Sequence, residues 1–238
     1  MIPIKDTIPS RRFSGVNLIL IGLNIFVFFL EISQGSNLQQ FIHNFGIIPS
    51  RYFYIKTHYP EEMLPRVLPI FTSMFLHGGW FHLLGNMLYL WIFGDNVEDR
   101  MGHLRYLIFY FLCGIGAGLF HIYTNPHSKI PSIGASGAIA GILGAYFILF
   151  PYSRIVTLVP FFFFWTFVEI PAFFFLGFWF LMQFFSGTAT LLAGERAAGG
   201  VAWWAHIGGF ISGIALLPFF LLGKKRGNSY YNVSRRNF

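Results

Sequence analysis

The sequence predicts an all-α membrane protein with six transmembrane helices and a long first outer loop. Of the 238 residues, 55% are hydrophobic and only 11% are charged, whereas about a quarter of the residues in an ordinary soluble domain are charged. Apolar stretches long enough to cross a hydrocarbon core of roughly 30 Å recur along the chain. The basic residues behind the net charge of +7 lie at the ends and in short connections, which argues against a nucleic-acid partner.

Six stretches fit a membrane-spanning helix, because a helix rises about 1.5 Å per residue. Residues 32–80, between the first two spans, are expected to form short helices in the outer interface, anchored by Tyr52, Tyr54 and Trp80. We interpret residues 1–12 as a cytoplasmic tail, 13–222 as one membrane domain and 223–238 as a basic cytoplasmic tail. The expected spans are 13–31, 81–94, 104–123, 136–150, 161–185 and 201–222.

The distribution of basic residues predicts the orientation. Most of the 16 Lys and Arg residues lie in the two tails and in the connections on the same side as the tails, and such residues favour the cytoplasmic side of a membrane. Both termini are therefore expected in the cytoplasm. Because no transit peptide precedes the first span, the bacterial cytoplasmic membrane is the expected location.

Four polar residues lie near the beginnings of predicted spans. His82 and Asn86 are in the second span, Ser136 begins the fourth, and His206 is in the sixth. These three spans all enter the membrane from the outer side, so the four side chains are expected near the same face. Polar groups in a membrane are costly unless they find a partner or line a wet cavity.

The short fourth span predicts how deep these groups lie. Residues 136–150 form a helix of only about 22 Å, so the loop before it must dip into the outer leaflet and carry Ser136 below the surface. His206 lies about 7 Å along its own helix, which gives a similar depth.

Glycines four residues apart line both helices. Taken alone, they are explained by helix packing, since small residues allow close approach in lipid. If the two stripes face each other, however, His206 comes within hydrogen-bonding reach of Ser136, and a neutral imidazole could take the serine proton during attack on a carbonyl. The sequence therefore predicts a Ser–His dyad. The stripe glycines are Gly137, Gly141, Gly209 and Gly213.

The other two polar residues suit an oxyanion-binding site. His82 and Asn86 are four residues apart and share one helix face. The backbone N–H of Ser136, at a helix N-terminus, is a third donor. The alternative is that His82 and Asn86 merely satisfy one another or a backbone carbonyl.

Metal ligation and an acidic third member are both disfavoured. The histidines near the outer face lack an HExxH or paired-cysteine spacing, so no metal or cofactor is expected. Glu169 is expected in the inner half of the fifth span, and the acids after the second span lie at its inner end, all too far from an outer-face site. The histidines are His77, His82, His121 and His127, and the acids are Asp95, Glu98 and Asp99.

The joint pattern resembles the rhomboid family of intramembrane serine proteases. It consists of Gly134-Ala135-Ser136-Gly137, His206 followed by two glycines, and His82 four residues before Asn86. Further matches are the segment 96–100 after the second span, His77, and Trp179 with Gln183 in the fifth. The resemblance covers nearly the whole chain.

The resemblance implies a six-helix rhomboid-like bundle with Ser136 as nucleophile and His206 as general base. It also implies structural roles for Gly134, Glu98 and Arg100, a lateral gate that includes Trp179 and Gln183, and a cap formed by loop 187–200. Substrates would be single-span membrane proteins cut near the outer face of the lipid bilayer.

Two departures from the family pattern bear on the site. Leu68-Pro69 stands where some members carry a Trp-Arg pair, and Ala140 stands where some carry a tyrosine that packs on the histidine ring. How His206 is held is therefore open. Two other functions also stay open: a non-catalytic rhomboid-like chaperone that binds membrane clients, and a small transporter or channel. The second is disfavoured because no ionisable path continues through the inner half.

Overall fold

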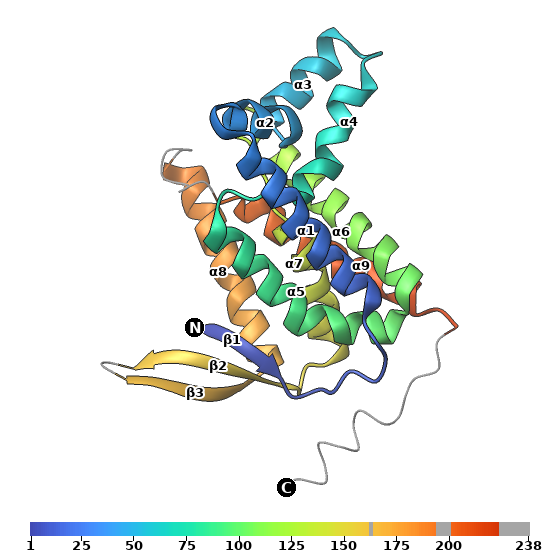
Figure 1. Ribbon diagram of the computed structural model, residues 1–238, viewed down its shortest axis with the longest axis vertical. Coiled ribbons are helices and arrows are strands. Elements are labelled where there is room, and N and C mark those ends of the chain that lie inside the picture. Colours follow the sequence, from blue (N-terminus) through green and yellow to red (C-terminus); the bar gives the residue numbers. More distant parts are fainter. Residues whose placement is uncertain (162–163, 194–200, 224–238) are drawn as a thin grey trace, which may run out of the picture.

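A helical bundle forms the body of the protein (Figure 1). The computed structural model describes residues 1–161, 164–193 and 201–223. Within this part, four helices are long and apolar enough to cross a membrane, and a helix pair bent by 79° between Phe75 and Trp80 is a fifth candidate. The bundle helices are α1 (Gly15–Ser33), α5 (Trp80–Met101), α6 (His103–Thr124), the shorter α7 (Ser136–Leu149), α8 (Ala172–Ala193) and α9 (Trp203–Leu221).

The first helix has polar residues inside and apolar residues outside. Asn17, Asn24 and Glu31 of α1 are buried, whereas Phe26 and Phe29 are more than half exposed. This arrangement is typical of a helix whose outer surface meets lipid, because apolar side chains cost nothing there and polar ones need protein partners. The prediction of a helical membrane bundle is therefore confirmed.

Short helices form a separate layer at one end of the bundle, as the sequence predicted for residues 32–80. The side chain of Arg51 holds the layer together by donating to the carbonyl oxygens of His43 and Gly46 at 2.5 and 2.8 Å. The elements are η1 (Gly35–Asn37), α2 (Leu38–Phe45), α3 (Pro49–His58), α4 (Met63–Thr72) and η2 (Ser73–Phe75).

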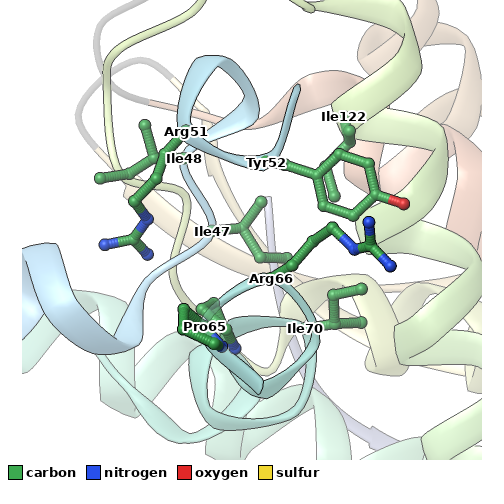
Figure 2. Close-up of a pocket in the computed structure, with 9 residues that line it drawn as sticks. Ile47, Ile48, Arg51, Tyr52, Pro65, Arg66, Ile70 and Ile122 are labelled. Atoms are coloured by element: carbon green, nitrogen blue, oxygen red, sulfur yellow. The ribbon is translucent and has the colours of Figure 1, made fainter. Parts of the chain in front are cut away.

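This layer packs on α6 through a small apolar core. Ile47, Ile70 and Ile122 form a buried cluster, and Tyr52 packs against it (Figure 2). The guanidinium of Arg66 lies 5.9 Å from the centre of the Tyr52 ring. The cavity among them has a volume of only about 10 Å³, which is about the room needed by one water molecule. The core is therefore closely packed, and it holds Ile47 in a fixed position.

A three-stranded antiparallel sheet lies at the opposite end of the bundle and was not anticipated. It consists of β1 (Ile2–Asp6), β2 (Arg154–Phe161) and β3 (Phe164–Pro171), in the order β1-β2-β3. Asp6 of β1 accepts hydrogen bonds from Tyr146 of α7 and, at 2.8 Å, from Asn96 of α5. Part of the segment expected to be an N-terminal tail is therefore bound to the bundle.

The sheet corrects the prediction that a span begins at residue 161. The described residues 164–171 form a strand, and α8 begins only at Ala172. Aromatic and β-branched residues favour strands, and Pro171 suits the boundary because proline is well tolerated on an edge strand and just before or in the first turn of a helix. Mean hydropathy cannot separate such a strand from a helix, because both are equally apolar.

The predicted location of Glu169 is corrected as well. It lies on β3 and not inside a span, and its carboxylate forms an exposed ion pair with Arg154 of β2 at 3.4 Å. The predicted absence of an acid beside Ser136 is unaffected, because Glu169 sits at the sheet end of the bundle.

Helices α7 and α9 approach each other at their glycines. A Cβ added to Gly209 would overlap the carbonyl oxygen of Gly137, and one added to Gly213 would overlap that of Gly141. Neither backbone oxygen can move aside as a flexible side chain could. These glycines therefore set the separation of the two helices, which is closer than any residue with a side chain permits.

Replacement of Gly209 by alanine tests this packing. In Gly209→Ala the new methyl group must push α9 away from α7, and overpacking of this kind costs about 1–3 kcal/mol. The thermal midpoint in detergent is expected to fall by several degrees. The matched control is Gly22→Ala on α1, where a Cβ meets nothing within 4 Å. Equal midpoints for the two variants would contradict the close approach.

Candidate active site

Ser136 is the first residue of α7, and its position is fixed by the loop before it. Residues Ile47 and Ser132 exchange backbone hydrogen bonds of 3.0 and 2.7 Å, which attach this loop to the layer of short helices. The N–H of Gly134 donates to the carbonyl oxygen of Ser73 at 2.8 Å. As the first helical residue, Ser136 has a backbone N–H without an intrahelical acceptor.

His206 of α9 lies directly against Ser136. The distance between His206 Nε2 and Ser136 Oγ is 2.8 Å, and the distance between His206 Nδ1 and Gln183 Oε1 is also 2.8 Å. An amide oxygen can only accept a hydrogen bond, so Nδ1 carries the proton. Nε2 is then unprotonated and accepts the hydrogen bond from the serine hydroxyl, which is the arrangement that a general base requires.

His82 of α5 and Ser136 both lie close to Gly134. The N–H of Gly78 donates to His82 Nδ1 at 3.2 Å, so Nε2 carries the proton and is a donor. A Cβ on Gly134 would lie 2.7 Å from His82 Nε2 and 3.4 Å from Ser136 Oγ, and the φ of Gly134 is +127°. Both the backbone angle and the close approach require glycine here.

A cavity of about 650 Å³ connects these groups. It is lined by Ser136, His206, His82 and Asn86, together with Trp179 of α8. The Nδ2 group of Asn86 is buried and has no hydrogen-bond partner among the described residues. An unsatisfied buried donor is costly, so an acceptor that enters the cavity would find Asn86 free to bind it.

The four polar residues that the sequence grouped therefore lie around one cavity, and α7, α9 and α5 bring them there. Trp179 lies close to this group, with its ring 5.9 Å from that of His206. Glu98 lies far from the cavity, at the other end of α5, and accepts hydrogen bonds from the N–H groups of Val16 and Asn17 at 3.0 and 2.7 Å. Arg100 lies in the last turn of α5.

The expected cap differs from the structure in part. Residues 187–193 continue α8 as helix and are not loop, and residues 194–200 lie outside the described residues, as do residues 224–238 of the expected C-terminal tail. Among the described residues, no group of three or more His, Cys, Asp or Glu side chains is arranged to hold a metal ion.

The sequence does not predict the supporting roles of Gln183 and Glu31. Gln183 was assigned to the gate, not to His206. The carboxylate of Glu31 accepts the N–H of His77 at 2.9 and 3.2 Å and so holds the turn that carries Gly78. A signal is present in the sequence, since Asn17, Asn24 and Glu31 recur every seven residues and so share one face of a largely apolar helix.

Comparison with known proteins identifies the class. A family model described as Rhomboid domain matches residues 65–223. The chain is 28% identical over 200 residues to "Rhomboid protein 1, mitochondrial" from Saccharomyces cerevisiae, covering 82% of this chain and 50% of that protein. It is 36% identical over 128 residues to "Rhomboid protease GluP" from Bacillus subtilis, covering 53% of this chain and 23% of that protein.

The chain belongs to the rhomboid family and is a multi-pass membrane protein. It spans half or less of the length of these curated relatives. The family also contains a protein named as inactive: the chain is 41% identical over 76 residues to "Inactive RHOMBOID-like protein 8" from Arabidopsis thaliana, covering 32% of this chain and 21% of that protein.

Proposed function

We propose that this protein is an intramembrane serine endopeptidase that hydrolyses peptide bonds in or near the transmembrane segments of membrane proteins. The observation that carries the proposal is the 2.8 Å hydrogen bond between Ser136 Oγ and His206 Nε2. The relative from Bacillus subtilis that is named a rhomboid protease supports the same class of activity.

In the proposed reaction, Ser136 Oγ attacks the carbonyl carbon of the scissile peptide bond while His206 Nε2 takes its proton. The imidazolium then gives this proton to the leaving amine, and the acyl group stays on Ser136. A water molecule next loses a proton to His206 and attacks the ester carbon, which releases the acid product and returns the proton to Ser136. The reaction uses no metal or cofactor.

The negative oxygen that forms during attack needs donors arranged in advance. The candidates are the backbone N–H of Ser136, the Nε2–H of His82 and the Nδ2–H of Asn86. His82 and Asn86 line the same cavity as the nucleophile, and Asn86 has no competing partner among the described residues. Preorganised donors of this kind are worth about 2.7–4 kcal/mol each in related chemistry.

The proposed substrates are single-span membrane proteins that reach the cavity from the lipid. Trp179 of α8 lines the cavity, and the outer surface of α8 carries exposed Phe178 and Leu181. We propose α8 as the lateral gate and the bacterial cytoplasmic membrane as the location, with both termini in the cytoplasm.

A second candidate is a non-catalytic protein that binds membrane clients. It is favoured by the relative named as inactive. Client binding alone, however, does not need a histidine whose tautomer is set for accepting the proton of a serine, and this chain has that arrangement.

Cleavage by the reconstituted full-length chain distinguishes a protease from a non-catalytic client-binding protein. With a single-span model substrate, Ser136→Ala and His206→Ala are each expected to lower the cleavage rate by at least about 10³-fold, because each removes one member of the dyad. Ser33→Ala is the matched control, since Ser33 is an exposed serine of α1 whose hydroxyl donates to the carbonyl oxygen of Leu30 in the same helix. Cleavage that persists in Ser136→Ala overturns the proposal, and client binding without cleavage by the unaltered chain favours the second candidate.

A further inference from the structure

We propose that Gln183 is a positioning residue for His206 and that it makes the orientation of the base depend on α8. This inference rests on the proposed function. The residue was grouped with the gate on the basis of resemblance alone, but its side chain points to a different role. Gln183 is buried, and its Oε1 atom lies 2.8 Å from His206 Nδ1.

Three hydrogen-bonded side chains then form one continuous line. Gln183 of α8, His206 of α9 and Ser136 of α7 are joined by two hydrogen bonds of 2.8 Å each. In a Ser–His–Asp triad an acid occupies the outer position and holds the imidazole in the correct tautomer and orientation. An amide oxygen can do the same work of orientation, because it accepts the Nδ1–H in the same way.

The contribution of a neutral amide differs from that of an acid. It adds no negative charge beside the imidazolium, so it acts by restricting rotation of the ring and by fixing the tautomer. Aromatic rings limit the remaining freedom: Trp179 lies 5.9 Å and Trp203 6.4 Å from the His206 ring, centre to centre. Gln183 and these rings therefore hold His206 in place, although Ala140 provides no tyrosine ring to pack on it.

The positioning residue belongs to the helix that we propose as the gate. Helix α8 meets α9 through Phe180 against Phe210, 4.8 Å between ring centres, and through Gly187 against Trp203. If α8 swings outward to admit a substrate, Gln183 leaves Nδ1 without its acceptor. The base is therefore correctly oriented only when α8 is seated against α9, which links closure of the gate to activation of the nucleophile.

Variants of Gln183 in the reconstituted full-length protein test the inference. Gln183→Leu keeps the size and removes the acceptor, so kcat is expected to fall by about 10- to 100-fold, less than the loss when a triad acid is replaced, with KM changed by less than about two-fold. Gln183→Glu keeps an oxygen acceptor and is expected to restore most of kcat. Met182→Leu, at an exposed neighbour on the same helix, is the matched control.

A readout that does not depend on cleavage separates this inference from the proposed function. The ¹⁵N spectrum of the His206 ring is expected to show one tautomer with the proton on Nδ1 in the unaltered chain and a tautomer mixture in Gln183→Leu. An unaltered chain with the single tautomer but no cleavage would refute the protease and not the positioning. A change in KM alone, or an unchanged tautomer in Gln183→Leu, overturns the positioning role.

A second inference rests on the β2–β3 hairpin and does not depend on the dyad: we infer that the hairpin lies in the lipid boundary beside α8. Figure 1 shows it projecting sideways from the bundle at the start of that helix. Phe164, Trp165 and Phe167 are 76%, 62% and 66% exposed. Aromatic side chains gathered in this way mark a surface that water does not cover in the working protein.

Lipid is the partner that fits this surface. Strand β3 runs directly into α8, where Phe173 and Phe174 are also exposed, so the aromatic surface of the hairpin continues the outer surface of a candidate span. Its described charges, Arg154 and Glu169, are paired with each other near the base. Tryptophan is enriched at the level of the lipid headgroups, which suits Trp165.

Spin labels can locate the hairpin. Single cysteines at Phe167, at Lys5 on the same sheet and at Phe178 on α8 are placed in a Cys113→Ala background, because Cys113 is the one cysteine of the chain. In phosphatidylethanolamine–phosphatidylglycerol vesicles, position 167 is expected to resemble position 178, with high accessibility to oxygen and low accessibility to a water-soluble nickel chelate. Accessibility like that of position 5, or spin–spin broadening between copies, overturns the lipid contact.

Discussion

The close approach of α7 and α9 is the constraint on which the candidate site depends. Gly209 and Gly213 have no side chains, so the backbone of α9 lies against the carbonyl oxygens of α7. At this separation the imidazole of His206 on one helix reaches the hydroxyl of Ser136 on the other at 2.8 Å. In lipid, where no hydrophobic force drives helices together, such packing is also a main source of association. The same glycines thus hold the fold together and bring Ser136 to His206.

The two histidines that line the cavity are each held by a neighbour from another element or turn. His82 is set as a donor by the N–H of Gly78, and the turn that carries Gly78 is held by Glu31 from α1. His206 is set as an acceptor toward Ser136 by Gln183. When α8 is packed against α9, these partners orient both histidines before charge develops, which is the condition for electrostatic stabilisation.

The sequence could predict the residues of the site better than its supports. Ser136, His206, His82 and Asn86 were found because polar residues at the beginnings of spans with one orientation must share a face of the membrane. Gln183 was assigned another role, because the rotation of α8 against α9 is not encoded in residue spacing. Strand β3 is predicted as helix because the apolar run that begins at Phe161 has the hydropathy of a span, and only its pairing with β2 distinguishes it.

The central claim is that Ser136 is a nucleophile activated by His206. It is tested most directly by treating the full-length protein in lipid with a fluorophosphonate probe and locating the adduct by mass spectrometry. We expect a single adduct on Ser136 Oγ, which forms at least about 10²-fold more slowly in His206→Ala because the general base is lost. An unlabelled Ser136, or labelling at the same rate without His206, would contradict it.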